Sequence, residues 1–324
     1  DGVSRSGAPL LVEVTRGDSV ESWHEVDAVV VGTDGTVVDS WGDTARRVLP
    51  RSALKPIQAI PLVATGAADS FALTEVELAL ACASHDGEPA HVEAVAGWLE
   101  RVGVPVGELA CGAHRPISEA AAIGLAEAGQ RYTALHNNCS GKHAGFLTLC
   151  RYLDLSTDRY CDPSHQLHRD HVSLVIEERC GIDLAGQEPA VDGCGIPAWG
   201  VPLERLAAGW ATLGIGRPHS PEGRLLDAMR SEPFFVAGQD RACTRMIKGS
   251  TGGTVVKTGA EGVFCAVVPD DGVGVALKVR DGAGRGSSAA LAWVLTRLDR
   301  LPAAGEEAVV NHAGLPVGVT RVVG

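Results

Sequence analysis

The sequence predicts an α/β protein of the α+β kind, in which one antiparallel sheet made from both chain ends carries flanking helices and an inserted all-helical lobe. Runs rich in β-branched residues lie at both ends of the chain, and runs with helical patterning fill the middle. Because neither a repeat nor a low-complexity linker separates them, we expect a single domain over residues 1–324. Its sheet lobe would span about 1–65 and 250–324, and its helical lobe about 66–249.

The first elements are predicted as strands. Residues 10–15 form a β-branched run, and residues 24–31 and 36–41 form a strand pair around the turn Thr33-Asp34-Gly35. A helix is expected from residue 52 to about 64, with Pro56 in its first turn, where a missing N–H does no harm. Pro61 is expected to kink this helix.

The middle of the chain is predicted to be helical. Thr74 and Glu77 have the spacing of a capping box for a helix through residue 82. Two loops that contain glycine are expected at 83–87 and 191–197. The last predicted elements are a strand over 255–268 that Gly259 interrupts, a strand over 274–280 and a closing helix over 287–298. The tail after Pro302 has no distinctive pattern. The other expected helices are 89–101, 118–127, 144–153, 163–179, 203–213, 222–230 and 238–248.

Composition excludes several classes of function. The chain has 324 residues and a net charge of −12, and its Lys and Arg residues cluster no further than pairs, which argues against nucleic acid or an anionic membrane as partner. No run approaches the roughly 18 apolar residues of a membrane helix. The nine cysteines are odd in number and lack the spacing of a disulfide framework, so we expect reduced thiols and a cytoplasmic protein.

Two short motifs suggest a nucleophilic site. Ser52 and Lys55 form an S-x-x-K signature, and residues three apart share one face of a helix, so the amine can take the hydroxyl proton if it is neutral. Lys257 opens a K-T-G sequence and could be the second cation that keeps Lys55 neutral. Alone, S-x-x-K fits an N-cap serine and a solvated lysine equally well. Together with K-T-G it is the pairing that marks serine β-lactamases and penicillin-binding proteins.

Five runs, in this order, resemble the L-asparaginase II family, the rhizobial-type or class 3 asparaginases. The resemblance covers roughly residues 12–298, and it implies a serine β-lactamase/glutaminase fold, hydrolysis of L-asparagine to L-aspartate and ammonia, and a homodimer. The runs are Arg51-Ser52-Ala53-Leu54-Lys55-Pro56, Cys82-Ala83-Ser84-His85, Asn137-Asn138-Cys139-Ser140-Gly141-Lys142-His143, Asp192-Gly193-Cys194-Gly195 and Lys257-Thr258-Gly259-Ala260-Glu261-Gly262-Val263.

The resemblance also implies roles for ten residues. The family's nucleophile falls on Ser52, its lysines on Lys55 and Lys257, and its second serine on Ser84. Its substrate contacts fall on Arg51, His143 and Asp192, and its zinc ligands on Cys139, Lys142 and Cys194. Thiolates suit zinc, whereas lysine is an unusual ligand because it must lose its proton. We expect zinc to hold substrate rather than to generate the nucleophile.

The expected reaction begins with attack of Ser52 Oγ on the side-chain amide, with Lys55 as general base. Ammonia leaves an aspartyl ester, and water then releases aspartate. Ser84 would relay a proton, and the backbone N–H of Ser52 with one from the strand after Lys257 would form an oxyanion hole. Simpler interpretations stay open: a backbone-bound hydroxyl at Ser84, an Asx-type loop bond at Asp192, and small buried side chains for the cysteines.

Two other functions compete with this hypothesis. A glutaminase, or another serine amidase such as a β-lactam or D-peptide hydrolase, would use the same residues, since a pocket discriminates one methylene only about 10–200-fold. A non-enzymatic metal or redox sensor built on the cysteines would not depend on Ser52. The histidines at 165, 168 and 171 are spaced by three, and we expect them on a solvated helix face rather than at a metal.

Overall fold

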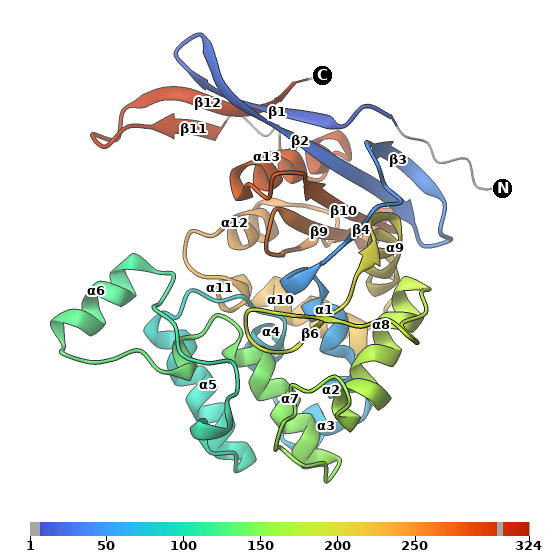
Figure 1. Ribbon diagram of the computed structural model, residues 1–324, viewed down its shortest axis with the longest axis vertical. Coiled ribbons are helices and arrows are strands. Elements are labelled where there is room, and N and C mark those ends of the chain that lie inside the picture. The colour runs from blue at the N-terminus through green and yellow to red at the C-terminus, as the bar shows by residue number, and fades with distance from the viewer. Residues whose placement is uncertain (1–6, 303–306, 324) are drawn as a thin grey trace. The chain divides into compact units, whose positions relative to one another are not determined.

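The computed structural model describes residues 7–302 and 307–323 of the chain (Figure 1). The chain divides into two units. The first comprises 1–53, 200–215 and 246–324, and the second comprises 54–199 and 216–245. The single domain expected from the sequence stays a prediction. Within the described ranges, no helix combines the length and the apolar composition that crossing a membrane needs.

The first unit is built on an antiparallel sheet with the strand order β11-β12-β1-β2-β10-β9-β8, to which β3 adds by pairing with β2. Strands from both chain ends are interleaved, which confirms the predicted fold class. The strands are β1 (Leu10–Arg16), β2 (Ser19–Gly32), β3 (Val37–Trp41), β8 (Val255–Thr258), β9 (Val263–Val268), β10 (Val273–Val279), β11 (Glu307–Val310) and β12 (Pro316–Val323).

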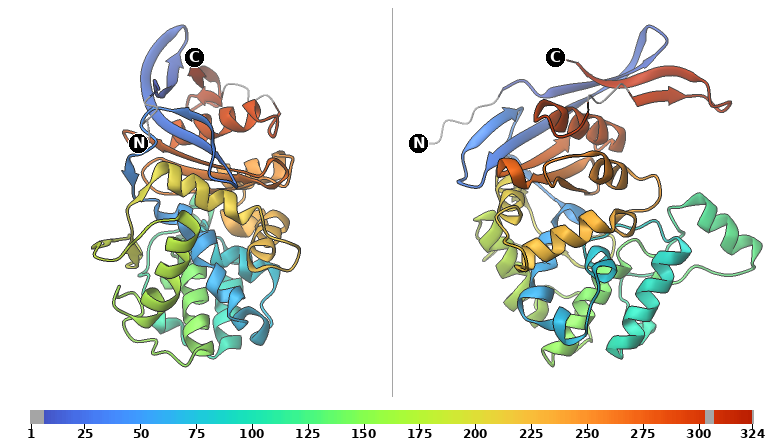
Figure 2. Two further views of the ribbon diagram at one scale, coloured as in Figure 1. Left: turned by 90° about the vertical axis from the view of Figure 1, so that its right-hand side faces the viewer. Right: turned by 180° about the vertical axis from the view of Figure 1, so that it is seen from behind.

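Helices cover both faces of the strands at the centre of this sheet. Gly274 on β10 faces α9 (Leu203–Leu213), where an added Cβ would meet the backbone of Ala207, and Val279 on the same strand lies by Gly286 of α13 (Gly284–Arg297). Because residues an odd number apart point to opposite faces of a strand, the two helices lie on opposite faces of β10 (Figure 2). All six residues of β9 are therefore buried.

Asp27 joins three segments of the first unit. Its carboxylate is fully buried and accepts hydrogen bonds from Arg280 Nη2 at 2.7 Å, Arg46 Nη1 at 2.7 Å and the N–H of Asp43 at 2.9 Å. Burial alone would raise the pKa of Asp27, but the hydrogen bonds from Arg280 and Arg46 outweigh it and hold the pKa below its usual value. The ionised carboxylate therefore ties β2 to the ends of β3 and β10.

One predicted strand boundary in the first unit was wrong. Strand β2 begins at Ser19 rather than at residue 24, because it continues as an exposed hairpin with β1 beyond the covered part of the sheet. The tail after Pro302, which has no distinctive pattern in the sequence, contains β11 and β12. A short pair also forms between β4 (Arg47–Val48) and β7 (Val201–Pro202), and a 3-10 turn η5 spans Pro269–Asp271.

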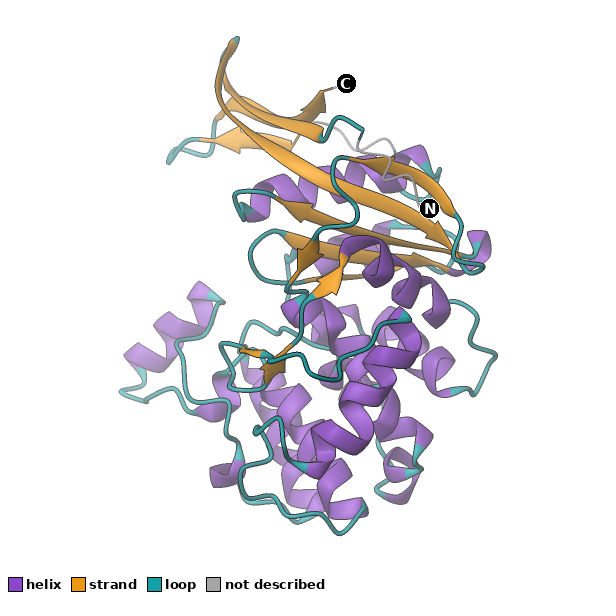
Figure 3. Ribbon diagram, turned by 45° about the vertical axis from the view of Figure 1, so that its right-hand side comes forward, coloured by secondary structure: helices purple, strands orange, loops and turns teal. Residues whose placement is uncertain are grey.

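The second unit is mostly helical, apart from a two-stranded hairpin of β5 (Ala190–Val191) and β6 (Pro197–Ala198) (Figure 3). Helix α7 (Ser140–Tyr152) is buried from Ser140 through Cys150 and packs against α2, α3, α4 and α5. The helices of this unit are α1 (Lys55–Gln58), α2 (Ile60–Ala64), α3 (Ala67–Ser70), α4 (Glu75–Ala81), α5 (Pro89–Val102), α6 (Glu119–Glu127), α7, α8 (Ser173–Cys180), α10 (Pro221–Ser231) and α11 (Pro233–Val236), with 3-10 turns η2 (Val106–Glu108) and η3 (Ala134–His136).

Helix boundaries follow local chemistry. The predicted capping box of Thr74 and Glu77 is present at the start of α4, and α5 ends at Gly103 in the left-handed conformation. The predicted helix over 52–64 is instead broken into the 3-10 turn η1 (Arg51–Leu54), α1 and α2, because Pro56 and Pro61 each begin a new turn. The predicted helix over 238–248 starts later, as α12 (Ala242–Gly249).

Candidate active site

Ser52 lies on η1 in the first unit. The segment is held by the indole Nε1 of Trp210, which donates to the carbonyl of Ala53 at 3.1 Å, and by the N–H of Ala53, which donates to the carbonyl of Pro50 at 3.0 Å. Arg51, directly before the serine, has φ of 53°. A residue other than glycine in this region stores on the order of 1–3 kcal/mol of strain, and such residues cluster at functional sites.

Lys257 lies in strand β8 of the same unit, and Gly259 directly follows that strand. Lys257 is fully buried, and its Nζ donates to the carbonyl of Thr258 at 2.7 Å. A Cβ added to Gly259 would lie well inside 3.0 Å of the Pro50 carbonyl oxygen and at 3.0 Å from Val263 Cβ. The glycine therefore lets the K-T-G strand end pack directly against the backbone that leads into Ser52, as the two motifs require.

Lys55 lies at the start of α1 in the second unit, fully buried. Its amine donates to Ser84 Oγ at 3.0 Å, to Cys139 Sγ at 3.2 Å and to the carbonyl of Ala83. The structure thus brings together three predicted site residues, Lys55, Ser84 and Cys139, within one unit.

His85 and Ser140 connect the two segments that carry Ser84 and Cys139. The N–H of His85 donates to the carbonyl of Asn138 at 3.1 Å, and its ring Nε2 lies 2.8 Å from Ser140 Oγ. Burial, then the nearby His91 and Lys55, lower the pKa of His85 well below its usual value, so the ring is neutral. Because the N–H of Gly87 donates to its Nδ1 at 3.1 Å, Nε2 carries the proton and donates to Ser140.

The predicted zinc ligands also lie together in the second unit, all buried. Lys142 Nζ, on α7, is 3.0 Å from the Sγ of Cys194, on the β5–β6 turn. A hydrogen bond from Cys194 lowers the pKa of Cys139 well below its usual value, because this bond and the positive charges of Lys55 and Lys142 together outweigh the effect of burial. The same hydrogen bond and burial raise the pKa of Cys194. Burial disfavours a charged Lys142, but the negative charge of the cysteines holds its pKa above the usual value.

These three side chains fit a zinc ion. Two thiols and an amine are zinc ligands once they have lost their protons, and a three-ligand set would leave a position for water or substrate. Among residues 7–302 and 307–323, no group of three or more His, Cys, Asp and Glu side chains has the arrangement of a metal site.

The predicted substrate-binding residues occupy three places. Arg51 belongs to the first unit, and His143 lies fully buried on α7 in the second, where burial and the charges of Lys142 and Lys55 lower its pKa well below the usual value. Asp192 lies on the turn after β5, half-buried, and its Oδ1 accepts from the N–H of Gly193 at 2.6 Å. This bond is to the residue directly after Asp192, whereas an Asx turn bonds the N–H two residues on, so both interpretations of Asp192 stay predictions.

The histidines at 165, 168 and 171 differ from the prediction of a solvated face. His168 is buried and packs edge-on against Phe146, with ring centroids 5.7 Å apart, and it begins a π-helical turn over His168–Val172. Sequence reasoning also missed the contacts of His85 and of Tyr160, whose hydroxyl lies 2.6 Å from His143 Nδ1. His85 stands within a motif that we quoted, whereas Tyr160 carries no sequence signal.

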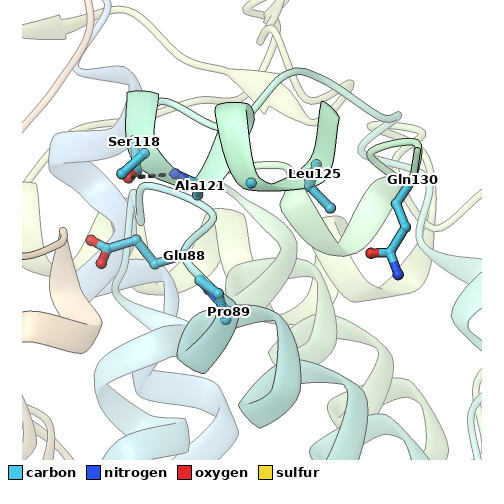
Figure 4. Close-up of a pocket in the computed structure, with 8 residues that line it drawn as sticks. Glu88, Pro89, Ser118, Ala121, Leu125 and Gln130 are labelled. Carbon is cyan, nitrogen blue, oxygen red and sulfur yellow. Dashed lines mark hydrogen bonds between the residues drawn. The ribbon is translucent and has the colours of Figure 1, made fainter. Parts of the chain in front are cut away.

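A groove of about 430 Å³ lies beneath α6, lined by residues that include Glu88, Ser118, Leu125 and Gln130 (Figure 4). Its polar groups are already used in the fold. Ser118 Oγ caps α6 by accepting from the N–H of Ala121, and Glu88 accepts from the N–H of Gln239. None of the ten predicted site residues lines this groove.

Comparison with known sequence families identifies the class of protein to which the chain belongs. The sequence family described as L-asparaginase II matches residues 12–324. The protein is therefore an amidohydrolase by class. The chain belongs to the L-asparaginase II family. A search of curated proteins found no significant match.

Solved structures with a similar arrangement include two proteins described as β-lactamases. One is a β-lactamase from Mycobacterium bovis, with a TM-score of 0.41 and 14% identity, covering 85% of this chain and 95% of the other. The second is a candidate β-lactamase from Bacteroides dorei DSM 17855, with a TM-score of 0.40 and 12% identity, covering 78% of this chain and 84% of the other.

Proposed function

We propose that this protein hydrolyses the side-chain amide of L-asparagine to L-aspartate and ammonia through a covalent intermediate on Ser52. The observation that carries the proposal is the buried Lys55 amine, held against Ser84 Oγ at 3.0 Å in a chain of the L-asparaginase II family. A lysine this deeply buried, beside a serine and three residues after another serine, is typical of a proton-transfer group.

The proposed reaction has two halves. In its neutral form, Lys55 takes the proton as Ser52 Oγ bonds to the amide carbon, and the proton passes through the Ser84 hydroxyl to the leaving nitrogen, which departs as ammonia. Water then attacks the aspartyl ester, the ester C–O bond breaks, and Ser52 regains its proton. Lys257, whose strand end packs against the Pro50 carbonyl, supplies positive charge beside the Ser52 segment.

Substrate recognition is proposed for three residues. Arg51 suits the α-carboxylate, since a guanidinium binds carboxylates in a bidentate manner. Asp192 suits the α-amino group, and His143 contacts a polar group of the same substrate. The homodimer and the cytoplasmic location expected from the sequence remain predictions.

Zinc is proposed as a bound ion, held by Cys139, Lys142 and Cys194. When bound, it would supply a positive charge that attracts and orients an oxygen or nitrogen of the substrate. Lys55 contacts Cys139 at 3.2 Å, so the ion would lie near the proton-transfer lysine, and no proton transfer in the proposed reaction depends on it.

The test measures ammonia release from L-asparagine and from L-glutamine by the native chain, by Ser52→Ala and by Ser70→Ala, an exposed serine of the second unit. We expect asparagine turnover by the native chain and by Ser70→Ala, and its loss in Ser52→Ala. Mass spectrometry of rapidly quenched native protein should find one aspartyl group on the peptide that contains Ser52. Preference for glutamine would keep the mechanism and change the substrate, whereas turnover that survives Ser52→Ala would refute the nucleophile.

A further inference from the structure

A buried ring nitrogen on α7 lacks a partner. His143 is fully buried, and its Nδ1 lies 2.6 Å from the hydroxyl of Tyr160. Its other nitrogen, Nε2, is also buried and has no hydrogen-bond partner among the residues that the structure describes. Buried polar atoms of this kind are rare in native proteins and commonly mark a bound ligand or water.

Tyr160 decides which nitrogen of His143 carries the proton. The N–H of Ala110 donates to the Tyr160 oxygen at 2.9 Å, which occupies one lone pair of that oxygen and leaves the phenol proton for another acceptor. Burial raises the pKa of Tyr160, so the phenol keeps this proton.

Two acceptors compete for the phenol proton. The first is His143 Nδ1, and the second is the thiol of Cys161, which also faces Tyr160. A thiol sulfur is a weak acceptor, whereas an imidazole nitrogen at 2.6 Å is a strong one, so the proton goes to Nδ1. A neutral imidazole that accepts at Nδ1 carries its own hydrogen on Nε2, and that nitrogen is therefore a donor.

We propose that Tyr160 is a positioning residue that fixes His143 as an Nε2–H donor toward an oxygen acceptor of the bound substrate. This inference rests on the proposed function, and it deepens it by stating the chemistry of one contact. The acceptor is a carboxylate or carbonyl oxygen, since an ammonium or an N–H group would face the ring N–H unfavourably. Asparagine offers such oxygens in its α-carboxylate and its side-chain amide.

The position of Tyr160 suits this role. It lies in the segment between α7 and the π-helical turn, and its hydroxyl joins that segment to Ala110, which follows η2. The hydroxyl is thus fixed from the backbone on one side before it meets His143 on the other. The ring of Tyr160 also packs edge-on against the imidazole, with centroids 5.5 Å apart, so both the proton and the plane of His143 are constrained.

The test compares Tyr160→Phe, which removes only the hydroxyl, with Tyr132→Phe, the same change at an exposed tyrosine. Protein labelled with ¹⁵N-histidine reports the tautomer of His143, whose signals are assigned by their loss in His143→Gln. We expect the Nε2–H form in the native chain, and a shift of its Nε2–H signal when L-aspartate, the proposed product, is added. In Tyr160→Phe we expect a mixture of tautomers and a KM for L-asparagine raised roughly tenfold or more, with a smaller change in kcat.

Each measurement separates the inference from the proposed function. Native protein with the Nδ1–H form would overturn the assignment of the donor. An Nε2–H signal that L-aspartate does not shift, together with unchanged KM and kcat in Tyr160→Phe, would show that the donor serves a buried water. Zinc content and melting temperature are measured in parallel, and a KM effect that appears only with loss of zinc or of folded protein would also overturn it. If the native chain does not hydrolyse asparagine, the proposed function fails, while the native spectrum still tests the contact with Tyr160.

Discussion

Replacing Gly259 with alanine tests whether the K-T-G strand end positions the segment of Ser52. Gly259 does not adopt a left-handed backbone, so the substitution adds only a methyl group and no backbone strain. That methyl group would lie closer than 3.0 Å to the Pro50 carbonyl oxygen, a distance that real Cβ atoms essentially never show, and ordinary contact begins at 3.4 Å. The two backbones must therefore separate by at least 0.4 Å.

The expected cost follows from that displacement. Overpacking a rigid contact destabilises a protein by about 1–3 kcal/mol, and backbone atoms on both sides leave no flexible side chain to yield. For a chain of this length, each kcal/mol lowers the melting temperature by roughly 1.5 °C. Because Pro50 lies two residues before the proposed nucleophile, and catalytic groups must be held to about 0.5 Å, we expect kcat for asparagine to fall roughly tenfold or more.

The assay is ammonia release together with thermal unfolding. The matched control is Gly97→Ala in the exposed middle of α5, where an added Cβ meets nothing within 4 Å. That variant should keep full activity and gain about 0.5–1 kcal/mol, because alanine is the better helix residue. If Gly259→Ala retains native stability and kcat while Gly97→Ala behaves as stated, the argument for a tight contact between the motifs is refuted.

Three further predictions concern other parts of the chain. Asp27→Asn should lower the free energy of unfolding by about 3 kcal/mol at neutral pH. The pKa of Asp27 is lower in the folded protein than in the unfolded chain, so the ionised carboxylate stabilises the fold at pH values above the unfolded pKa of about 4. That stabilisation is lost as the pH falls through the folded pKa. Urea unfolding curves of variant and native protein should therefore converge in acid, and a constant difference down to pH 2 would contradict this. Cys194→Ser should lower the amount of bound zinc at least tenfold, as measured by plasma mass spectrometry. Cys180→Ser, which changes a buried thiol on α8, should leave the zinc content unchanged. Equal zinc content in the two variants would rule out Cys194 as a ligand. His85→Asn should cost about 1–3 kcal/mol and lower kcat roughly tenfold with KM little changed, and an unaltered kcat in folded protein would mean that Ser84 is placed without it.

Elements with a strong local signal could be predicted from the sequence. Strands β9 and β10 are β-branched runs, and helix α4 begins at a capping box, so the sequence predicted all three elements. Strands β11 and β12 were missed because their residues are mostly exposed or half-buried, and neither a buried run nor a regular alternation distinguishes them. The pairing of β12 with β1 joins residues some three hundred positions apart, which no local pattern records.

The candidate site also contains residues that the sequence predicted and residues that it did not. The resemblance supplied Cys139, Lys142 and Cys194 as a set, and the structure places their side chains together within the second unit. Contacts that support the site, such as His85 with Ser140 and Tyr160 with Ala110, join residues about fifty positions apart. Such pairs depend on how helices and loops pack, and the residues involved are also common as ordinary core side chains, so the sequence alone does not distinguish them.

The pairing of β1 with β12 sets the order in which the first unit can be completed. Leu11 pairs with Val323, so nearly the whole chain is synthesised between the two partners. At ribosomal rates of about 5–20 residues per second, the outer edge of β1 waits roughly 15–60 s for β12. During that time the β1–β2 hairpin, which carries the exposed Trp23, has unpaired backbone groups that can bind other chains. The yield of folded protein should therefore depend on translation rate and on chaperones that shield nascent strands, even where the finished protein is stable.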